Sequence, residues 1–101
     1  MVGSAENCGS SSERTLRGLV VGRVQGVGFR WFVLQAARRH RIRGEVRNLP
    51  DGRVEFRSRG SVEDLERFVE AVRRGPLASR VDRVDTEQLE GETDFDDFTV
   101  R

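Results

Sequence analysis

The chain has 101 residues and a formal net charge of +1, which suits a single domain with one hydrophobic core. No apolar run reaches the ~18–20 residues that a membrane-spanning helix needs. All 18 basic residues are arginine, which excludes a lysine Schiff base and a lysine-dependent phosphate loop. A single histidine, His40, and a single cysteine, Cys8, exclude a zinc site built from Cys and His ligands and an intrachain disulfide.

The N-terminal part of the chain separates a tail from the folded domain. Residues 1–14 are rich in glycine and serine and have no periodicity, so we expect a disordered tail followed by one domain over residues 15–101. The N-terminus has no apolar region typical of a secretory signal, and we therefore expect a cytoplasmic protein. The first element of the domain is a buried strand at Thr15–Val21, which ends at Gly22.

A glycine-rich loop and a helix follow this strand. From Phe29 the apolar residues recur at helical spacing, which predicts a helix that ends near residues 41–43. Two short apolar runs, Val46–Leu49 and Val54–Phe56, then flank the turn sequence Pro50-Asp51-Gly52 and predict a β-hairpin.

The C-terminal half repeats the alternation of helix and strand. Ser61 opens a second predicted helix, with Asp64 three residues later as in a capping box, and Gly75-Pro76 ends it. Residues 81–89 are ambiguous: Val81 and Val84 are three apart, so a strand here needs a bulge, and a helix is not excluded. Phe98 and Val100 alternate in a short last strand.

The expected order is therefore β-α-β-β-α-β. It predicts an α+β fold of the ferredoxin-like type, in which an antiparallel sheet carries both helices on one face.

The loop between the first strand and the first helix is the best candidate for chemistry. First-turn amides of a helix have no intrahelical acceptor, and the helix dipole places partial positive charge there. Glycines let successive amides converge on an anion, and an arginine at the helix start adds a planar fork for phosphate oxygens. The alternative is a tight strand–helix connection with a surface arginine. The candidate phosphate-binding residues are Gln25, Gly26, Val27, Gly28, Phe29 and Arg30.

Two motifs in this region resemble the signatures of the acylphosphatase family. The first is Val20-x-Gly22-x-Val24-Gln25-Gly26-Val27-x-Phe29-Arg30, in which every specified position is met. The second is Gly44-x-Val46-Arg47-Asn48-x-x-x-Gly52-x-Val54, followed by Gly60. One position departs from the family: Glu45 stands where an aromatic residue is usual. On the exposed face of the sheet this change costs packing, whereas near the site it would repel an anionic substrate.

The resemblance implies an enzyme that hydrolyses the carboxyl–phosphate bond of acyl phosphates by in-line attack of a water. It assigns the catalytic roles to Arg30 and Asn48, with no metal and no cofactor. The expected partners are a small acyl phosphate as substrate and orthophosphate as product inhibitor. We expect the protein to be a monomer that binds neither nucleic acid nor membrane. The alternative function is a non-catalytic phosphate- or nucleic-acid-binding module of the same fold.

Several residues have plain structural interpretations that compete with functional ones. Asn48 precedes a turn, where asparagine often bonds its own backbone. Trp31 either lines the mouth of the site or packs over the edge of the sheet, and we favour packing. His40 ends the apolar stripe of the first helix, and we expect no catalytic role for it. Residues 38–59 are arginine-rich and residues 82–97 are acidic, a pattern that we interpret as solvated faces with local ion pairs rather than a steering field.

Overall fold

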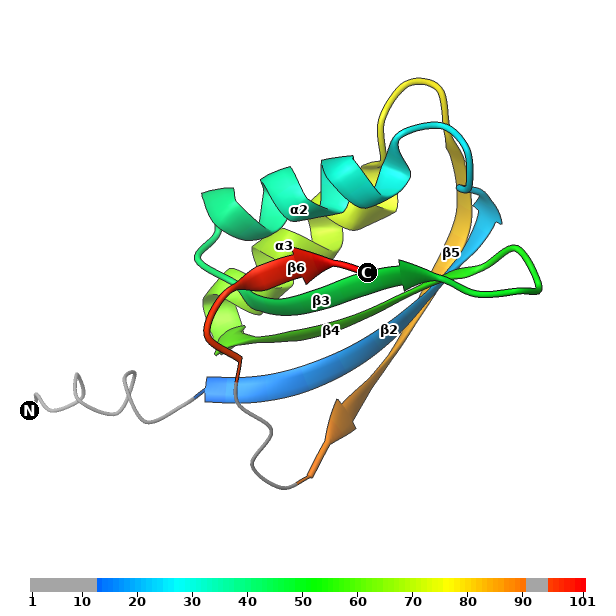
Figure 1. Cartoon of the computed structure of the whole chain (residues 1–101). Coiled ribbons are helices and arrows are strands. Elements are labelled where there is room, and N and C mark those ends of the chain that lie inside the picture. Colours follow the sequence, from blue (N-terminus) through cyan, green and yellow to red (C-terminus); the bar gives the residue numbers. More distant parts are fainter. Residues whose placement is uncertain (1–12, 91–94) are drawn as a thin grey trace, which may run out of the picture.

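The computed structural model describes residues 13–90 and 95–101. Within these ranges two helices and five strands form a two-layer domain, with both helices on one face of the sheet (Figure 1). In chain order the elements are β2 (Glu13–Arg23), α2 (Phe29–Arg39), β3 (Arg43–Asn48), β4 (Val54–Ser61), α3 (Val62–Arg74), β5 (Arg80–Leu89) and β6 (Phe98–Val100).

The strands lie in the order β5-β2-β4-β3-β6, and all neighbours are antiparallel except β3 and β6. β5 finishes at the end of the sheet where β3 begins. The chain therefore enters β6 from that end and runs alongside β3 in the same direction. The predicted ferredoxin-like α+β fold is confirmed, with a mixed sheet in place of a purely antiparallel one.

Every predicted element is present, and its bounds differ from the prediction only at the ends. β2 begins at Glu13, so the last two residues of the expected tail, which spanned residues 1–14, belong to the first strand. Residues 1–12, including Cys8, lie outside the described residues. The ambiguous segment is a strand, β5. Its pairing with β2 passes from Arg83 directly to Val81, which leaves Asp82 as the extra residue of the bulge that the valine spacing required.

The core fills the space between the sheet and the helices. Phe68 of α3 contacts Phe56 of β4 edge to face, with ring centroids 5.3 Å apart, and Phe98 of β6 at 6.0 Å. These rings tie β6 and α3 to the central strand. At the start of α3 the Ser61 hydroxyl accepts a hydrogen bond from the Asp64 amide at 3.1 Å, so the predicted cap is present. Neither described helix has the length and apolar character needed to cross a membrane.

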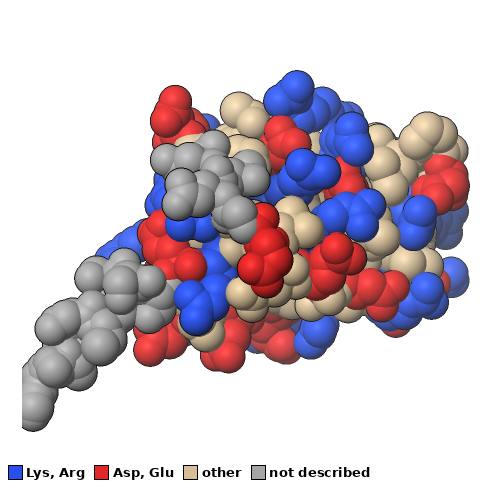
Figure 2. Space-filling view, turned by 90° about the horizontal axis from the view of Figure 1, so that it is seen from below, with Lys and Arg blue, Asp and Glu red and all other residues tan. Residues whose placement is uncertain are grey.

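The face of the sheet that turns away from the helices is charged (Figure 2). Acidic and basic side chains are interspersed there, as the ion-pair interpretation expects. Glu55 lies at its centre with only 4% of its side chain exposed, and its two oxygens accept from Arg17 Nε and, at 2.8 Å, from Arg47 Nε. Burial raises the pKa of Glu55, but the hydrogen bonds and charges of the two arginines outweigh burial, so its pKa is lowered overall.

Candidate active site

A cavity of about 500 Å³ opens between α2, the loop before it and β6. Arg30 and Asn48, the two residues that the resemblance identifies as catalytic, both line it, although they are 18 positions apart in the sequence. The other lining residues come from the loop (Val24, Gly26, Gly28), from α2 (Phe29, Trp31, Leu34, Arg38) and from the segment of residues 97–100.

Two glycines shape the loop that closes one end of the cavity. Gly26 and Gly28 both have φ of 75°, in the left-handed region that residues with a side chain rarely adopt. A Cβ atom at either position would meet no other atom within 4 Å, so it is the backbone conformation that calls for glycine here. Left-handed residues in such a loop turn successive amide groups toward one side, which produces a concave anion site.

The start of α2 lacks the usual side-chain cap. Gly28 is the N-cap and supplies no side-chain hydrogen bond, and the first turn holds no acidic residue. The start of α3 differs: Ser61 caps it, and Glu63 and Asp64 place negative charge in its first turn. The partial positive charge at the start of α2 is thus left uncompensated by the helix itself, at the point where the cavity opens.

Arg30 lies in the first turn of α2, and its half-buried side chain lines the cavity. Its Nη1 atom donates a hydrogen bond of 2.7 Å to the main-chain oxygen of Arg101. The amide of Arg101 in turn donates to the Val46 oxygen at 2.8 Å, which extends the β3–β6 pairing beyond Val100. A guanidinium has five N–H donors, so this one contact orients the group and leaves donors for an anion.

Asn48 is the last residue of β3 and is exposed. Its carboxamide has no hydrogen-bond partner within the part of the chain that the structure describes. The alternative interpretation of Asn48 as a residue that bonds the adjoining turn therefore finds no support in the contacts. The expected hairpin turn is present, and it is closed by main-chain bonds between Leu49 and Arg53 and between Gly52 and Leu49.

Gln25 holds this turn in place of Asn48. Its Nε2 atom donates to the Leu49 oxygen at 2.8 Å and to the Arg53 oxygen at 2.9 Å, which uses both protons of the amide. Gln25, which lies in the loop before α2, thereby links this loop to the hairpin that carries Asn48. This role was not predicted, because the sequence analysis considered only the backbone amide of Gln25.

The six predicted phosphate-binding residues do not all lie on the cavity. Gly26, Gly28, Phe29 and Arg30 line it, whereas Gln25 and Val27 do not. Val27 is partly buried against the hydrophobic core, and the Gln25 side chain points to the hairpin. The backbone amides of all six residues remain candidates for phosphate binding, while only four of these residues form walls of the cavity.

The far wall of the cavity and much of one of its sides were not predicted from the sequence. β6 forms the wall, and its pairing partner could not be deduced from the alternation of two apolar residues. Trp31 is 59% exposed at the cavity, so the packing interpretation favoured for it is wrong. Leu34 and Arg38 also line the cavity, and their spacing of four and eight residues from Arg30 is a signal that places them on the same side of the helix.

Glu45 and His40 lie away from this site. Glu45 alternates with the fully buried Val46, which places it on the charged face of the sheet, where its carboxylate pairs with Arg101 at 3.0 Å. The missing aromatic residue therefore affects the outer face of the sheet rather than the cavity. His40 is the C-cap of α2 and lines a different cavity, so it does not contact the site.

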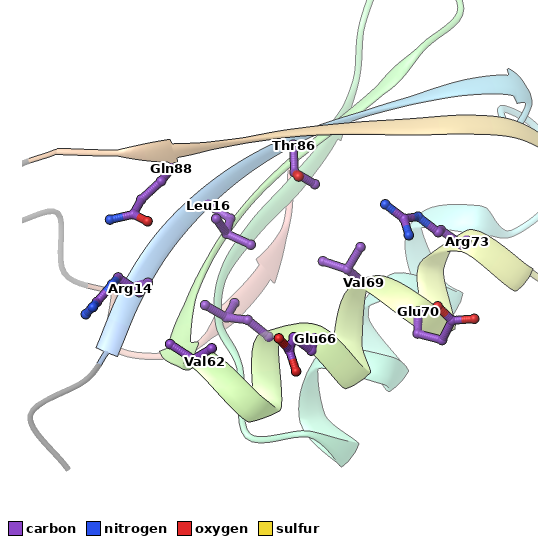
Figure 3. Close-up of a pocket in the computed structure, with 10 residues that line it drawn as sticks. Arg14, Leu16, Val62, Glu66, Val69, Glu70, Arg73, Thr86 and Gln88 are labelled. Carbon is purple, nitrogen blue, oxygen red and sulfur yellow. The ribbon is translucent and has the colours of Figure 1, made fainter. Parts of the chain in front are cut away.

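A second cavity, of about 430 Å³, lies between α3 and the adjoining strands β2 and β5 (Figure 3). Its apolar floor includes Leu16 and Val69, and side chains of both charges surround it. None of the predicted site residues lines it. In the described part of the chain, no three His, Cys, Asp or Glu side chains are grouped in a way that could hold a metal ion.

Known proteins similar to this chain agree with the motifs. The sequence model of the acylphosphatase family matches residues 16–100. An acylphosphatase of Koribacter versatilis is 45% identical over 91 residues, which cover 90% of this chain and 83% of that protein. The crystal structure of acylphosphatase from Bacillus subtilis superposes with a TM-score of 0.83 at 38% identity, covering 86% of this chain and 97% of the other. An acylphosphatase from Coxiella burnetii gives a TM-score of 0.85 at 34% identity, covering 91% and 96%. This chain belongs to the acylphosphatase family.

Proposed function

We infer that this protein hydrolyses acyl phosphates to a carboxylate and orthophosphate. The family supports the reaction class, and one observation in the structure carries the assignment of residues. Arg30, Asn48 and the left-handed glycines Gly26 and Gly28 line one cavity, which is large enough for a small acyl phosphate.

We propose that the phosphoryl group binds at the start of α2. The loop amides and the uncapped first turn supply donors and partial positive charge. The Arg30 guanidinium supplies a full charge and parallel N–H groups that match two phosphate oxygens. Phosphoryl transfer passes through a loose transition state, so positioning and charge stabilisation provide most of the catalysis.

We propose that the Asn48 carboxamide orients the attacking water. A carboxamide both donates and accepts hydrogen bonds, and its neutrality avoids repulsion of the phosphate that a carboxylate would cause. The absence of a protein partner for this side chain among the described residues supports this role, because both ends of the carboxamide stay available.

The bond changes require no strong acid or base from the protein. Water oxygen bonds to phosphorus as the phosphorus–oxygen bond to the acyl group breaks, and that electron pair leaves on the carboxylate. The leaving acid has a pKa of roughly 4, so it departs as an anion without protonation. We propose that the proton of the water passes to a phosphate oxygen, since His40 lies outside this cavity.

Hydrolysis of benzoyl phosphate, followed by its ultraviolet absorbance in the presence of a chelator, tests the proposed function. We expect turnover that persists in chelator and that orthophosphate inhibits competitively, because orthophosphate presents the same oxygens to Arg30 and the loop. Absence of turnover by folded protein, with or without added divalent metal, would overturn the proposal.

The remaining proposals concern the form in which the protein acts. We propose a cytoplasmic monomer whose functional domain begins with β2 at Glu13, two residues before the expected start at residue 15. The residues assigned to the site all come from one chain, so no second copy is needed to complete it. Size-exclusion chromatography with light scattering tests the oligomeric state, and activity of a chain that begins at Glu13 tests whether residues 1–12 are dispensable.

The alternative of a nucleic-acid-binding module receives no support from the sheet. Base stacking on a sheet of this fold needs exposed aromatic residues on the central strands. The aromatic residue of β4, Phe56, is fully buried beneath the helices.

A further inference from the structure

The cavity extends beyond its phosphate end along one side of α2. Arg30, Leu34 and Arg38 follow each other at four-residue intervals and all line it. Eight residues of helix separate Arg30 from Arg38, a rise of about 12 Å. β6 runs along the opposite wall, with Asp97 and Phe98 near the Arg38 end and Arg101 near Arg30. The cavity is thus a groove with an arginine at each end, of which the proposed chemistry uses only one.

The middle of the groove is apolar and open to solvent. Trp31 is 59% exposed and Val100 40% exposed, and both line it. Among the described residues only four large hydrophobic side chains are exposed to this degree, and two of them face this one groove. Neither serves the hydrophobic core, and together with Leu34 they form an apolar surface next to the phosphate end.

Arg38, at the far end of the groove, has no ionic partner among the described residues. It is exposed, and no carboxylate of the described residues lies within 4 Å of its guanidinium nitrogens. Asp97 lines the same end of the groove, but its Oδ1 atom accepts the Phe98 amide at 2.8 Å rather than a bond from Arg38. The guanidinium of Arg38 is therefore free for a ligand anion, while Asp97 weakens the local positive potential.

We propose that this groove binds the acyl part of the substrate, and that Arg38 selects acyl groups that carry an apolar body and a second negative charge. The inference rests on the proposed function, because the phosphoryl group has to occupy the Arg30 end. From there the acyl chain follows Trp31 and Val100, and its distal carboxylate or phosphate meets the Arg38 guanidinium. The long arginine side chain spans part of the 12 Å between the two helix positions, so an acyl group the size of a benzene ring suffices.

The expected selectivity is modest for physical reasons. Exposed guanidinium–carboxylate pairs contribute little because water and salt screen them. Asp97 and the negative end of the α2 dipole oppose a second anion. We therefore expect Arg38 to change the choice between substrates by about two- to fivefold.

A pair of rigid substrates tests this inference. Benzoyl phosphate has only the apolar body, and 4-carboxybenzoyl phosphate adds a carboxylate at the far side of the ring. The measured quantity is the ratio of kcat/KM for the second substrate to that for the first. Comparing this ratio between variants cancels the intrinsic reactivity of the two acyl phosphates.

Arg38→Gln should lower the ratio about two- to fivefold at low salt. Arg39→Gln is the matched control, because Arg39 is the neighbouring exposed arginine and lines a different cavity. Asp97→Asn should raise the ratio, since it removes the opposing charge and keeps an oxygen for the Phe98 amide. In 0.5 M salt the differences between variants should disappear.

An unchanged ratio in Arg38→Gln, or an equal decrease in Arg39→Gln, would overturn the role of Arg38. Equal losses for both substrates in Arg38→Gln would also contradict it, since they would indicate damage to the phosphate end. If the wild-type protein hydrolysed neither substrate, the proposed function would fail, and the inference about Arg38 would fall with it.

Discussion

The side-chain amide of Gln25 donates to the Leu49 oxygen at 2.8 Å and so joins two segments that are 24 positions apart. A second bond, to the Arg53 oxygen at 2.9 Å, makes the same link on the other side of the hairpin turn. Gln25 belongs to the glycine-rich loop before α2, and Leu49 follows Asn48 directly. The Gln25 side chain, which lies outside the cavity, therefore adds a direct link between the loop amides and the hairpin of Asn48 to the pairing of β2 and β3 with β4.

Gln25→Ala should lower kcat for benzoyl phosphate about tenfold, with a smaller change in the inhibition constant of orthophosphate. Its loss lets the hairpin move relative to the loop, which misplaces the water while the amides and Arg30 still bind phosphate. The free energy of unfolding should also fall by about 1–3 kcal/mol, because two hydrogen bonds between the loop and the hairpin are lost. Steady-state kinetics and urea unfolding measure both effects.

Gln35→Ala serves as the control for this variant, because Gln35 is an exposed glutamine on α2 that does not line the site. It should leave both quantities unchanged. A Gln25→Ala protein with wild-type kcat would show that the hairpin holds Asn48 without this link.

Arg30→Lys should reduce kcat/KM for benzoyl phosphate by about 10²–10³-fold, a loss comparable to that of one oxyanion donor. Lysine keeps the charge but has neither the planar fork nor the reach to hold two phosphate oxygens and the Arg101 oxygen together. Orthophosphate should bind correspondingly more weakly, which competitive inhibition measures. Arg23→Lys is the matched control, because Arg23 is an exposed arginine at the end of β2. An Arg30→Lys enzyme with kcat/KM within threefold of wild type would contradict the proposed contact of Arg30 with two phosphate oxygens.

Asn48→Ala should lower kcat by at least 10²-fold and change the inhibition constant of orthophosphate by less than about threefold, because it removes the water-orienting group and leaves the phosphate site intact. Asn48→Asp should weaken orthophosphate binding as well, since it places a carboxylate beside the anion. Kinetics with both variants separate the two effects. Equal losses of turnover and phosphate affinity in Asn48→Ala, with the fold preserved, would instead indicate a structural residue.

The sequence predicted the features that depend on local chemistry. Gly26 and Gly28 predicted a tightly curled loop because few other residues adopt their backbone conformation, and Ser61 with Asp64 predicted the start of α3. The valine spacing in residues 81–89 required a bulge in any strand there, and Asp82 is that bulge. Such signals lie within a few residues of the feature that they predict.

The features that sequence analysis missed depend on contacts between distant segments. The position of β6 beside β3 follows from the path of the chain around the end of the sheet, which no local pattern encodes. The contacts of Gln25 with the hairpin and of Arg30 with Arg101 join segments 24 and 71 positions apart. The exposure of the Trp31 side chain at the cavity likewise depends on β6, which forms the facing wall and is 67 or more positions away in the sequence.

The buried carboxylate of Glu55 makes stability depend on pH. Arg17 and Arg47 lower its pKa in the folded protein below the ordinary value of 4.5. In the unfolded chain the carboxylate therefore takes up a proton at higher pH than in the folded protein. Its contribution to stability is complete above about pH 5 and is lost as the pH falls from the unfolded pKa through the folded one. Glu13, whose pKa Arg43 lowers chiefly through a side-chain hydrogen bond, adds to the loss over the same range.

Urea unfolding between pH 7 and pH 3 should therefore show a free energy of unfolding that is flat near neutrality and decreases below about pH 5. Glu55→Gln should lower the neutral-pH value by about 1–3 kcal/mol, because two half-exposed arginines lose a charged acceptor, and should weaken the pH dependence. Glu87→Gln is the control on the same face, since Glu87 is 62% exposed and lies 4.0 Å from Arg17. If Glu55→Gln kept the full acid sensitivity of the wild type, other carboxylates would have to cause this sensitivity. The ion pairs of Glu55 with Arg17 and Arg47 would then not be its source.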